Sequence, residues 1–193
     1  MTELFIKYLK GHVGDIYVWG AQGETNITEK WIRRRETGEK NAKRAIALWE
    51  KRKAEGRSPI AAFDCSGLIV KFLLDNKLIK SDMSSRGLYS ACEKLNDRSQ
   101  LAPGDLLFRH NGKRIHHVGA YIGCGLVIEA MGRDDGVVLN CLDSNGAGYW
   151  NRYGRLPVLK DSGETAEVPE CCKGECPCRQ LMKEILKGEN NEQ

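Results

Sequence analysis

Two short stretches of the chain carry residue types that together can perform nucleophilic catalysis. The first places Cys65 where a loop turns into a strongly apolar, helix-like run. The second, from His116 to Gly123, places His117 on an alternating, strand-like segment that ends in glycine. A thiol at the start of a helix and an imidazole on a neighbouring strand are a cysteine nucleophile and its general base. The pair therefore predicts acyl transfer through a thiol.

The position of Cys65 before a helix favours this chemistry. Unpaired backbone N–H groups and partial positive charge at a helix N-terminus favour thiolate over thiol, and the same N–H groups can stabilise an oxyanion. Asp64 and Ser66 flank the cysteine, and either can cap the helix. Both are predicted to contact substrate. A lone cysteine before a helix is more often structural, so the companions of Cys65 decide between the two interpretations.

The strand that carries His117 also predicts a partner for it. Alternate residues of a strand share a face, so His117 and Gly119 point one way while His116 points the other. A hairpin turn through Gly123-Cys124-Gly125 pairs Gly119 with Glu129, which places Glu129 diagonal to His117. With a slightly different turn, Glu129 lies directly opposite His117. A carboxylate there can accept the imidazole N–H and orient the ring.

Four motifs now stand in a recognisable order. They are Ile16-Tyr17-Val18-Trp19-Gly20, Asp64-Cys65-Ser66-Gly67, Leu101-Ala102-Pro103-Gly104-Asp105-Leu106, and His117-Val118-Gly119-Ala120-Tyr121-Ile122-Gly123. Over about residues 8–160 the chain resembles the NlpC/P60 cysteine peptidases. The resemblance implies an α+β, papain-like fold in which a buried helix carrying the nucleophile packs on an antiparallel sheet. Strand-like segments near residues 105–109, 117–122, 126–130 and 137–140 agree with such a sheet.

The resemblance also implies roles for individual residues. Cys65 is the nucleophile, His117 the base, and Tyr17 supplies a hydroxyl near the thiol that assists the oxyanion site. The third catalytic position, often histidine in this family, falls on Glu129. The implied reaction is hydrolysis of bacterial cell-wall peptides through an acyl-enzyme on Cys65, at the bond from γ-D-glutamate to a diamino acid.

Other functions remain open at this point. The same dyad serves an N-acetylmuramoyl-L-alanine amidase or an acyltransferase. A non-catalytic binding or assembly protein can keep the same fold and bind its partner through surfaces other than the catalytic site. The presence of both Cys65 and His117 favours the enzyme, a cysteine endopeptidase whose partner is a peptidoglycan peptide.

The chain divides into a catalytic domain, residues 1–160, and a tail, residues 161–193. The domain contains a charged, helical insertion at residues 24–60 that the family does not usually have. Between Glu24 and Arg57 there are eleven Lys/Arg and six Asp/Glu, a net charge of +5. This segment is either a solvated surface helix or a surface for an anionic partner, and its place in the chain suits a lid, a substrate-selecting wall or an oligomer contact. No nucleic-acid partner is expected.

The tail is acidic and rich in cysteine. From Asp161 to Gln193 there are four Lys/Arg and eight Asp/Glu, a net charge of −4, and a short helix is expected near the end. Four cysteines crowd into its middle: Cys171, Cys172, Cys176 and Cys178. They can hold zinc, form disulfides or stay unstructured, since their spacing is not the paired C-x-x-C of a strong zinc motif. Catalysis itself is predicted to need no cofactor.

Composition limits the remaining function classes. The chain has 193 residues with 41% hydrophobic residues, ordinary values for one globular domain with a tail. No apolar run approaches the ~18 residues of a membrane span, and the N-terminus lacks the basic and apolar regions of a secretory signal. We therefore expect a cytoplasmic protein without a membrane partner that acts on the wall after release, as a prophage endolysin or an internally acting hydrolase. The oligomeric state is left open.

Overall fold

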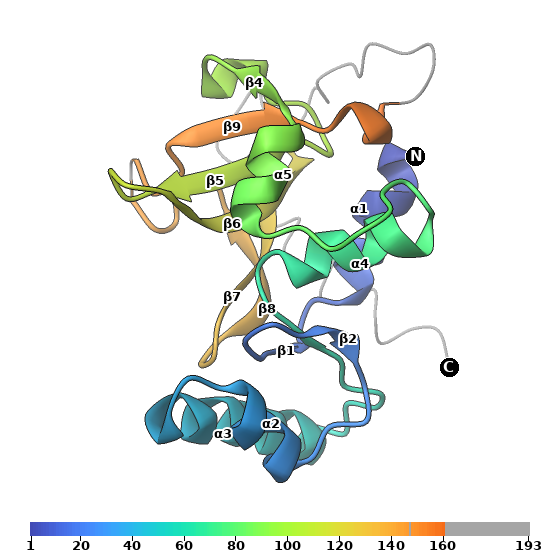
Figure 1. Cartoon of the computed structure of the whole chain (residues 1–193), viewed down its shortest axis with the longest axis vertical. Helices are drawn as coiled ribbons and strands as arrows, with labels where there is room; N and C mark the ends of the chain where they lie inside the picture. Colours follow the sequence, from blue (N-terminus) through green and yellow to red (C-terminus); the bar gives the residue numbers. More distant parts are fainter. Residues whose placement is uncertain (147, 161–193) are drawn as a thin grey trace.

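An antiparallel sheet lies at the centre of the structure (Figure 1). The computed structural model of the chain describes residues 1–146 and 148–160. Within them, six strands form this sheet in the order β4-β9-β5-β6-β7-β8. Their bounds are β4 Glu93–Leu95, β5 Leu106–His110, β6 Ile115–Gly123, β7 Leu126–Gly132, β8 Gly136–Cys141 and β9 Arg152–Arg155. The meander from β5 to β8 confirms the strands predicted from alternation.

A smaller sheet joins the N-terminal motif to the cysteine. In it, β1 (Ile16–Tyr17) pairs in parallel with β3 (Ala62–Phe63), and β2 (Gln22–Glu24) pairs antiparallel with β3. The N–H of Gly14 donates to the carbonyl of Val137, and the N–H of Val137 donates to the carbonyl of Asp15, each at 2.8 Å. These two bonds fasten the small sheet to β8. Tyr17 and Cys65 thereby occupy neighbouring segments.

Three helices gather on one side of the large sheet (Figure 1). They are α1 (Thr2–Gly11), α4 (Gly67–Asp75) and α5 (Ser85–Ala91). The apolar run that predicted a buried helix is α4, in which Leu68, Ile69 and Leu73 are almost fully buried. They share the largest apolar core with residues of β5, β6, β7 and β8. Burial of this face anchors the helix that follows Cys65. Two short 3₁₀ helices complete the fold, at Arg98–Gln100 and Pro157–Leu159.

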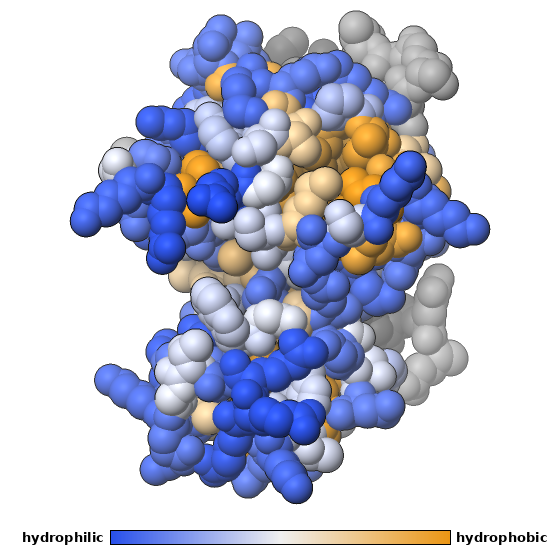
Figure 2. All heavy atoms as spheres, in the orientation of Figure 1, coloured by the Kyte–Doolittle hydropathy of each residue, from blue (hydrophilic) through white to orange (hydrophobic). Residues whose placement is uncertain are grey.

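The insertion forms two helices with an apolar core of their own. They are α2 (Glu29–Arg35), whose N-terminus is capped by the Thr28 hydroxyl, and α3 (Glu39–Ala54). Ile32 and Ala45 pack in one cluster with Ile16 of β1. Figure 1 shows both helices beyond β1 and β2, near the tip of the β7–β8 hairpin, and Figure 2 shows that hydrophilic side chains dominate their outer surface. The insertion is therefore packed onto the small sheet, not a detached appendage.

The hairpin from β6 to β7 has the register that the sequence predicted. Ala120 pairs with Ile128 and Tyr121 with Val127. Continued along the strands, this register places Gly119 opposite Glu129. The turn is built by residues 123–125, all three with positive φ. His117 is buried while His116 is exposed, as the alternation requires.

Some expectations fall outside this description. The proposed tail, residues 161–193, its four clustered cysteines and their zinc lie outside the described residues. Among the helices that are described, none is long and apolar enough to cross a membrane.

Gly67 gives a first test of the fold. A Cβ there would lie 2.0 Å from the carbonyl oxygen of Ala21, a backbone atom that cannot rotate away. We expect Gly67→Ala to cost about 3 kcal/mol and to lower the Tm by about 6–12 °C. The matched control is Gly11→Ala in α1, where a Cβ would meet nothing within 4 Å. It should melt at or above the wild-type temperature. Equal melting temperatures for the two variants, measured by circular dichroism, would contradict this packing.

Candidate active site

Asp64 shapes the loop that presents Cys65. Its carboxylate accepts hydrogen bonds from the N–H of Gly67 at 2.6 Å, from the hydroxyl of Ser66 at 3.1 Å and from the N–H of Gly20 at 3.0 Å. Asp64 thus supplies the cap of α4, while the Ser66 side chain makes no capping bond to the helix. Both residues are engaged with the loop itself, and their contact with substrate stays a prediction.

The electrostatic setting of the thiol differs from the one expected at a helix N-terminus. Burial raises the pKa of Cys65 to about 12, and the negative charge of Asp64 acts in the same direction. The backbone N–H groups of Val118, Ser66 and Cys65 itself lower the pKa and offset only part of this effect. At neutral pH the resting group is therefore a thiol, and it needs a base to become a nucleophile.

His117 and Glu129 form the predicted pair. The Nε2 of His117 lies 2.6 Å from the Oε2 of Glu129, and both side chains are buried. Because a carboxylate can only accept, Nε2 carries the proton and Nδ1 is the nitrogen left to act as a base. The backbone N–H of Val118, the residue after His117, lowers the pKa of Cys65, so the thiol lies near this strand. Imidazole and carboxylate are therefore arranged as the chemistry requires, and the approach of the thiol to Nδ1 stays a prediction.

Two further side chains hold Glu129, and the sequence analysis missed both. Asn140 on β8 donates from Nδ2 to Oε1 at 3.1 Å, and the hydroxyl of Tyr149 lies 3.4 Å from Oε2. Burial and the charge of Glu129 raise the pKa of Tyr149 to about 12, so the phenol stays a donor. Strand alternation could have revealed Asn140, because Val138 pairs with Glu129 and Asn140 lies two residues farther on. Tyr149 lies outside the strands and carries no comparable signal.

Trp150 and Gly119 fix the position of the imidazole ring. The Trp150 ring stacks on His117 with centroids 5.5 Å apart and planes 16° from parallel. A Cβ on Gly119 would lie 2.9 Å from the Trp150 ring and 3.1 Å from the Cβ of Glu129. Only glycine leaves room for both neighbours of His117. The stacked tryptophan was not predicted from the sequence.

Tyr17 is the third residue that the resemblance assigned to the site. It is buried on β1, and burial together with the charges of Cys65 and Asp64 raises the pKa of its phenol. The guanidinium of Arg133 stands 5.0 Å from the centre of its ring and partly opposes that shift. Tyr17 is thus a neutral donor near the sulfur, and its action on an oxyanion stays a prediction.

The comparison with known proteins agrees with this arrangement. The model of the NlpC/P60 family matches residues 14–155, a range that contains Tyr17, Cys65, His117 and Glu129. The chain belongs to the NlpC/P60 family.

Individual relatives agree with the family match. A probable endopeptidase p60 of Listeria grayi is 29% identical over 148 residues, covering 76% of this chain and 21% of that protein. The murein DD-endopeptidase MepH of Escherichia coli is 32% identical over 101 residues, 51% of this chain and 36% of that protein. The chain therefore spans only about a fifth to a third of the length of these relatives.

Among solved structures, RipD of Mycobacterium tuberculosis shares the fold. It is described as a non-catalytic NlpC/p60 domain protein adapted to peptidoglycan binding. The TM-score is 0.52 at 23% identity, over 80% of this chain and 96% of that one.

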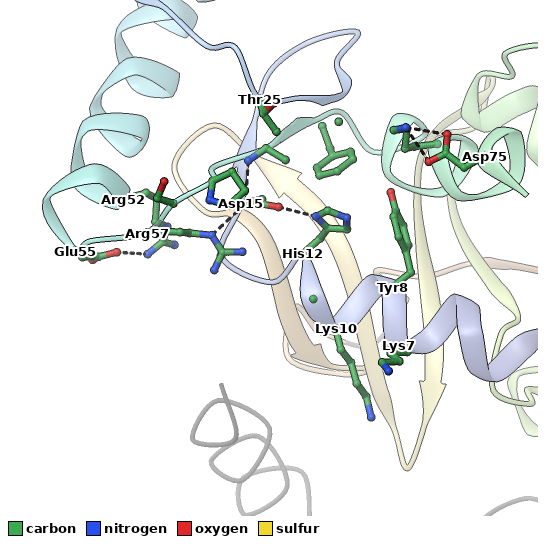
Figure 3. Close-up of a pocket in the computed structure, with 18 of the residues that line it drawn as sticks. Lys7, Tyr8, Lys10, His12, Asp15, Thr25, Arg52, Glu55, Arg57 and Asp75 are labelled. Carbon is green, nitrogen blue, oxygen red and sulfur yellow. Dashed lines mark hydrogen bonds and ion pairs between the residues drawn. The ribbon is translucent and has the colours of Figure 1, made fainter. Parts of the chain in front are cut away.

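A large open cavity lies elsewhere, between α1, the end of α3 and α4. Its volume is about 1160 Å³, and none of the four predicted catalytic residues lines it. Figure 3 shows that its charged groups largely pair with each other: Asp15 bonds His12 and Arg57, while Arg52 bonds Glu55. Asp15 also accepts from the N–H of Ala61. These pairs hold the start of β3 against α1.

The raised pKa of Cys65 predicts how its reactivity depends on pH. In a His117→Ala variant, alkylation by iodoacetamide should rise about tenfold per pH unit from pH 7 to 10 without a plateau, because the thiolate fraction keeps growing below the pKa. Mass spectrometry of the peptide that contains Cys65 measures this rate, with glutathione as the reference thiol in the same tube. A plateau near pH 8 to 9 would mean an ordinary, solvated thiol.

The support given by Glu129 predicts graded losses of activity. Glu129→Ala should lower kcat/KM about 100-fold and Glu129→Gln about 10-fold, since the amide oxygen can still accept the imidazole N–H. His117→Ala should abolish turnover, and His116→Ala, whose side chain faces away, should leave it near wild type. Rates are measured on a peptidoglycan peptide, with melting curves to confirm folding. Wild-type rates in both Glu129 variants would assign the orientation of His117 to another group.

Proposed function

We propose that this chain is a cysteine endopeptidase that hydrolyses amide bonds of peptidoglycan peptides. The observation that carries the proposal is the buried hydrogen bond between His117 and Glu129, in a chain that keeps Cys65 just before the start of α4. In a member of the NlpC/P60 family, this constellation supports a working thiol dyad with an orienting carboxylate. The scissile bond we propose is the one from γ-D-glutamate to a diamino acid.

The geometry supports a two-step reaction. As the sulfur of Cys65 attacks the amide carbonyl, Nδ1 of His117 takes the thiol proton and Glu129 stabilises the imidazolium. The oxyanion receives hydrogen bonds from N–H groups at the start of α4 and from the Tyr17 hydroxyl. The C–N bond breaks, and His117 returns the proton to the leaving amine. Water, deprotonated by His117, then attacks the thioester, and the acid leaves as the thiol reforms.

The high pKa of the resting thiol is compatible with this order of reaction steps. Proton transfer to His117 and attack on the carbonyl are coupled, so the enzyme needs no standing thiolate. The buried carboxylate lowers the cost of a transient positive charge on the ring. The thiol remains protonated until substrate arrives.

A second candidate is a non-catalytic peptidoglycan-binding protein, because RipD keeps the fold and is described in those terms. The presence of Cys65 together with the hydrogen-bonded pair of His117 and Glu129 favours the enzyme here. An amidase or an acyltransferase would use the same groups and differ in the products.

Digestion of purified peptidoglycan tests these alternatives together. The wild-type protein should release peptide fragments that end in γ-D-glutamate, identified by mass spectrometry. Cys65→Ala should release none and melt at the wild-type temperature, because the change removes the nucleophile without opening a large cavity. Cys141→Ala, which removes another partly exposed thiol, should keep full activity.

Other reaction products would indicate an activity other than the proposed endopeptidase. Peptides freed at their N-terminal L-alanine would indicate an amidase. Cross-linked or transferred products would indicate an acyltransferase. Binding to peptidoglycan without any cleavage by the wild-type protein would favour the non-catalytic alternative, and cleavage by folded Cys65→Ala would exclude the thiol mechanism.

A further inference from the structure

Arg133 lies in the turn between β7 and β8, and its guanidinium stands over the ring of Tyr17, one of the predicted catalytic residues. Its Nε donates to the Oε2 of Glu36 at 2.8 Å. The side chain of Glu36 is fully buried, and that of Arg133 is 16% exposed. Glu36 is the residue that ends α2, so the contact joins the insertion to the hairpin that carries Glu129.

The carboxylate of Glu36 fixes more than the arginine. Its Oε1 accepts the N–H of Trp19 at 3.0 Å, just after β1. A second ion pair joins the same regions, because Arg44 of α3 donates from Nε to Asp134 at 2.8 Å in the same turn. The insertion therefore binds both the end of β1 and the β7–β8 turn. Arg133 is held at the meeting point of the three segments.

One end of the Arg133 guanidinium is left for a ligand. In the part of the chain that the structure describes, neither terminal nitrogen of Arg133 has a hydrogen-bond acceptor. Neither nitrogen is a buried atom that lacks a hydrogen-bond partner. Among the described residues, only the Nε of Arg52 is such an atom. The terminal nitrogens are therefore open to solvent. The guanidinium lies over the ring of Tyr17, the residue whose hydroxyl is predicted to assist the oxyanion site.

This arrangement fits a carboxylate of the substrate. A guanidinium offers two parallel N–H donors that match a carboxylate in geometry and charge. When glutamate is linked through its γ-carboxyl group, its α-carboxyl group stays free, separated from the scissile carbonyl by Cα and two methylene groups. We propose that Arg133, held in place by Glu36, binds this α-carboxylate and makes the insertion a specificity element of the site. This proposal rests on the proposed function and names the substrate group that the enzyme selects, the α-carboxylate of the γ-linked glutamate.

The test compares two synthetic peptides that differ in one group. Both are γ-linked L-alanyl-D-glutamyl-diamino acid peptides, one with a free α-carboxylate on the glutamate and one with an α-carboxamide. Wild-type enzyme should prefer the carboxylate peptide about 10- to 100-fold in kcat/KM, mostly through KM. Raising the ionic strength should reduce this preference.

Two variants isolate the arginine. Arg133→Gln alone leaves Glu36 buried without its partner and can fail to fold, so the main variant combines Glu36→Gln with Arg133→Gln. In it, the amide oxygen introduced at position 36 can still accept the N–H of Trp19. The preference should fall to about twofold or less, with kcat/KM for the carboxamide peptide kept near wild type. The control is Arg44→Gln, which removes the same charge from the same region but leaves Arg133 in place. It should keep the full preference.

Each failure has its own signature. An undiminished preference in the folded double variant, or an equal loss of kcat/KM on both peptides, would overturn the role of Arg133. Wild-type cleavage of both peptides at equal rates would overturn it as well, while leaving the proposed function intact. If the wild-type protein cleaved neither peptide, the proposed function would fail and this proposal with it.

Discussion

The hydrogen bond between His117 and Glu129 is the interaction on which the rest of the site depends. It is buried, so each partner must be satisfied inside the protein. That requirement accounts for Asn140 on the next strand, and the diagonal pair leaves room only for glycine at Gly119. Removing one partner of such a pair commonly costs about 3–5 kcal/mol. The centre of the sheet is therefore built around this polar contact as much as around its apolar neighbours.

Burial affects the two halves of the predicted dyad in different ways. At Cys65 it outweighs the backbone N–H groups and keeps the proton on sulfur. His117 is buried as well, but its Nε2 is hydrogen-bonded to the carboxylate of Glu129, which leaves Nδ1 as the nitrogen that can act as a base. In the proposed mechanism, reactivity depends on the base rather than on a preformed thiolate. A protonated thiol also reacts more slowly with alkylating agents and oxidants until a substrate carbonyl is in place.

The insertion is packed and ion-paired to the segments that surround the predicted site. Its apolar residues complete the core against β1 and β3, and its Glu36 and Arg44 hold the β7–β8 turn. Removing the whole segment would therefore expose a core as well as change the site. Of the three roles that the sequence left open, the proposal for Arg133 takes the substrate-selecting wall, because these contacts position Arg133. Figure 2 shows that the outer surface of the insertion is hydrophilic.

The sequence alone determined the features that depend on local periodicity. The apolar run of α4, the alternation around His117 and the glycine turn at residues 123–125 were enough to predict the helix, the hairpin register and Glu129 beside His117. Tertiary structure decided what depends on contacts between distant segments. Trp150 over His117, Asn140 at Glu129, and Arg133 between Glu36 and Tyr17 join residues that no local pattern connects. The pKa of Cys65 depends on the fold for the same reason, because the helix start is visible in the sequence but the burial that raises the pKa exists only in the folded chain.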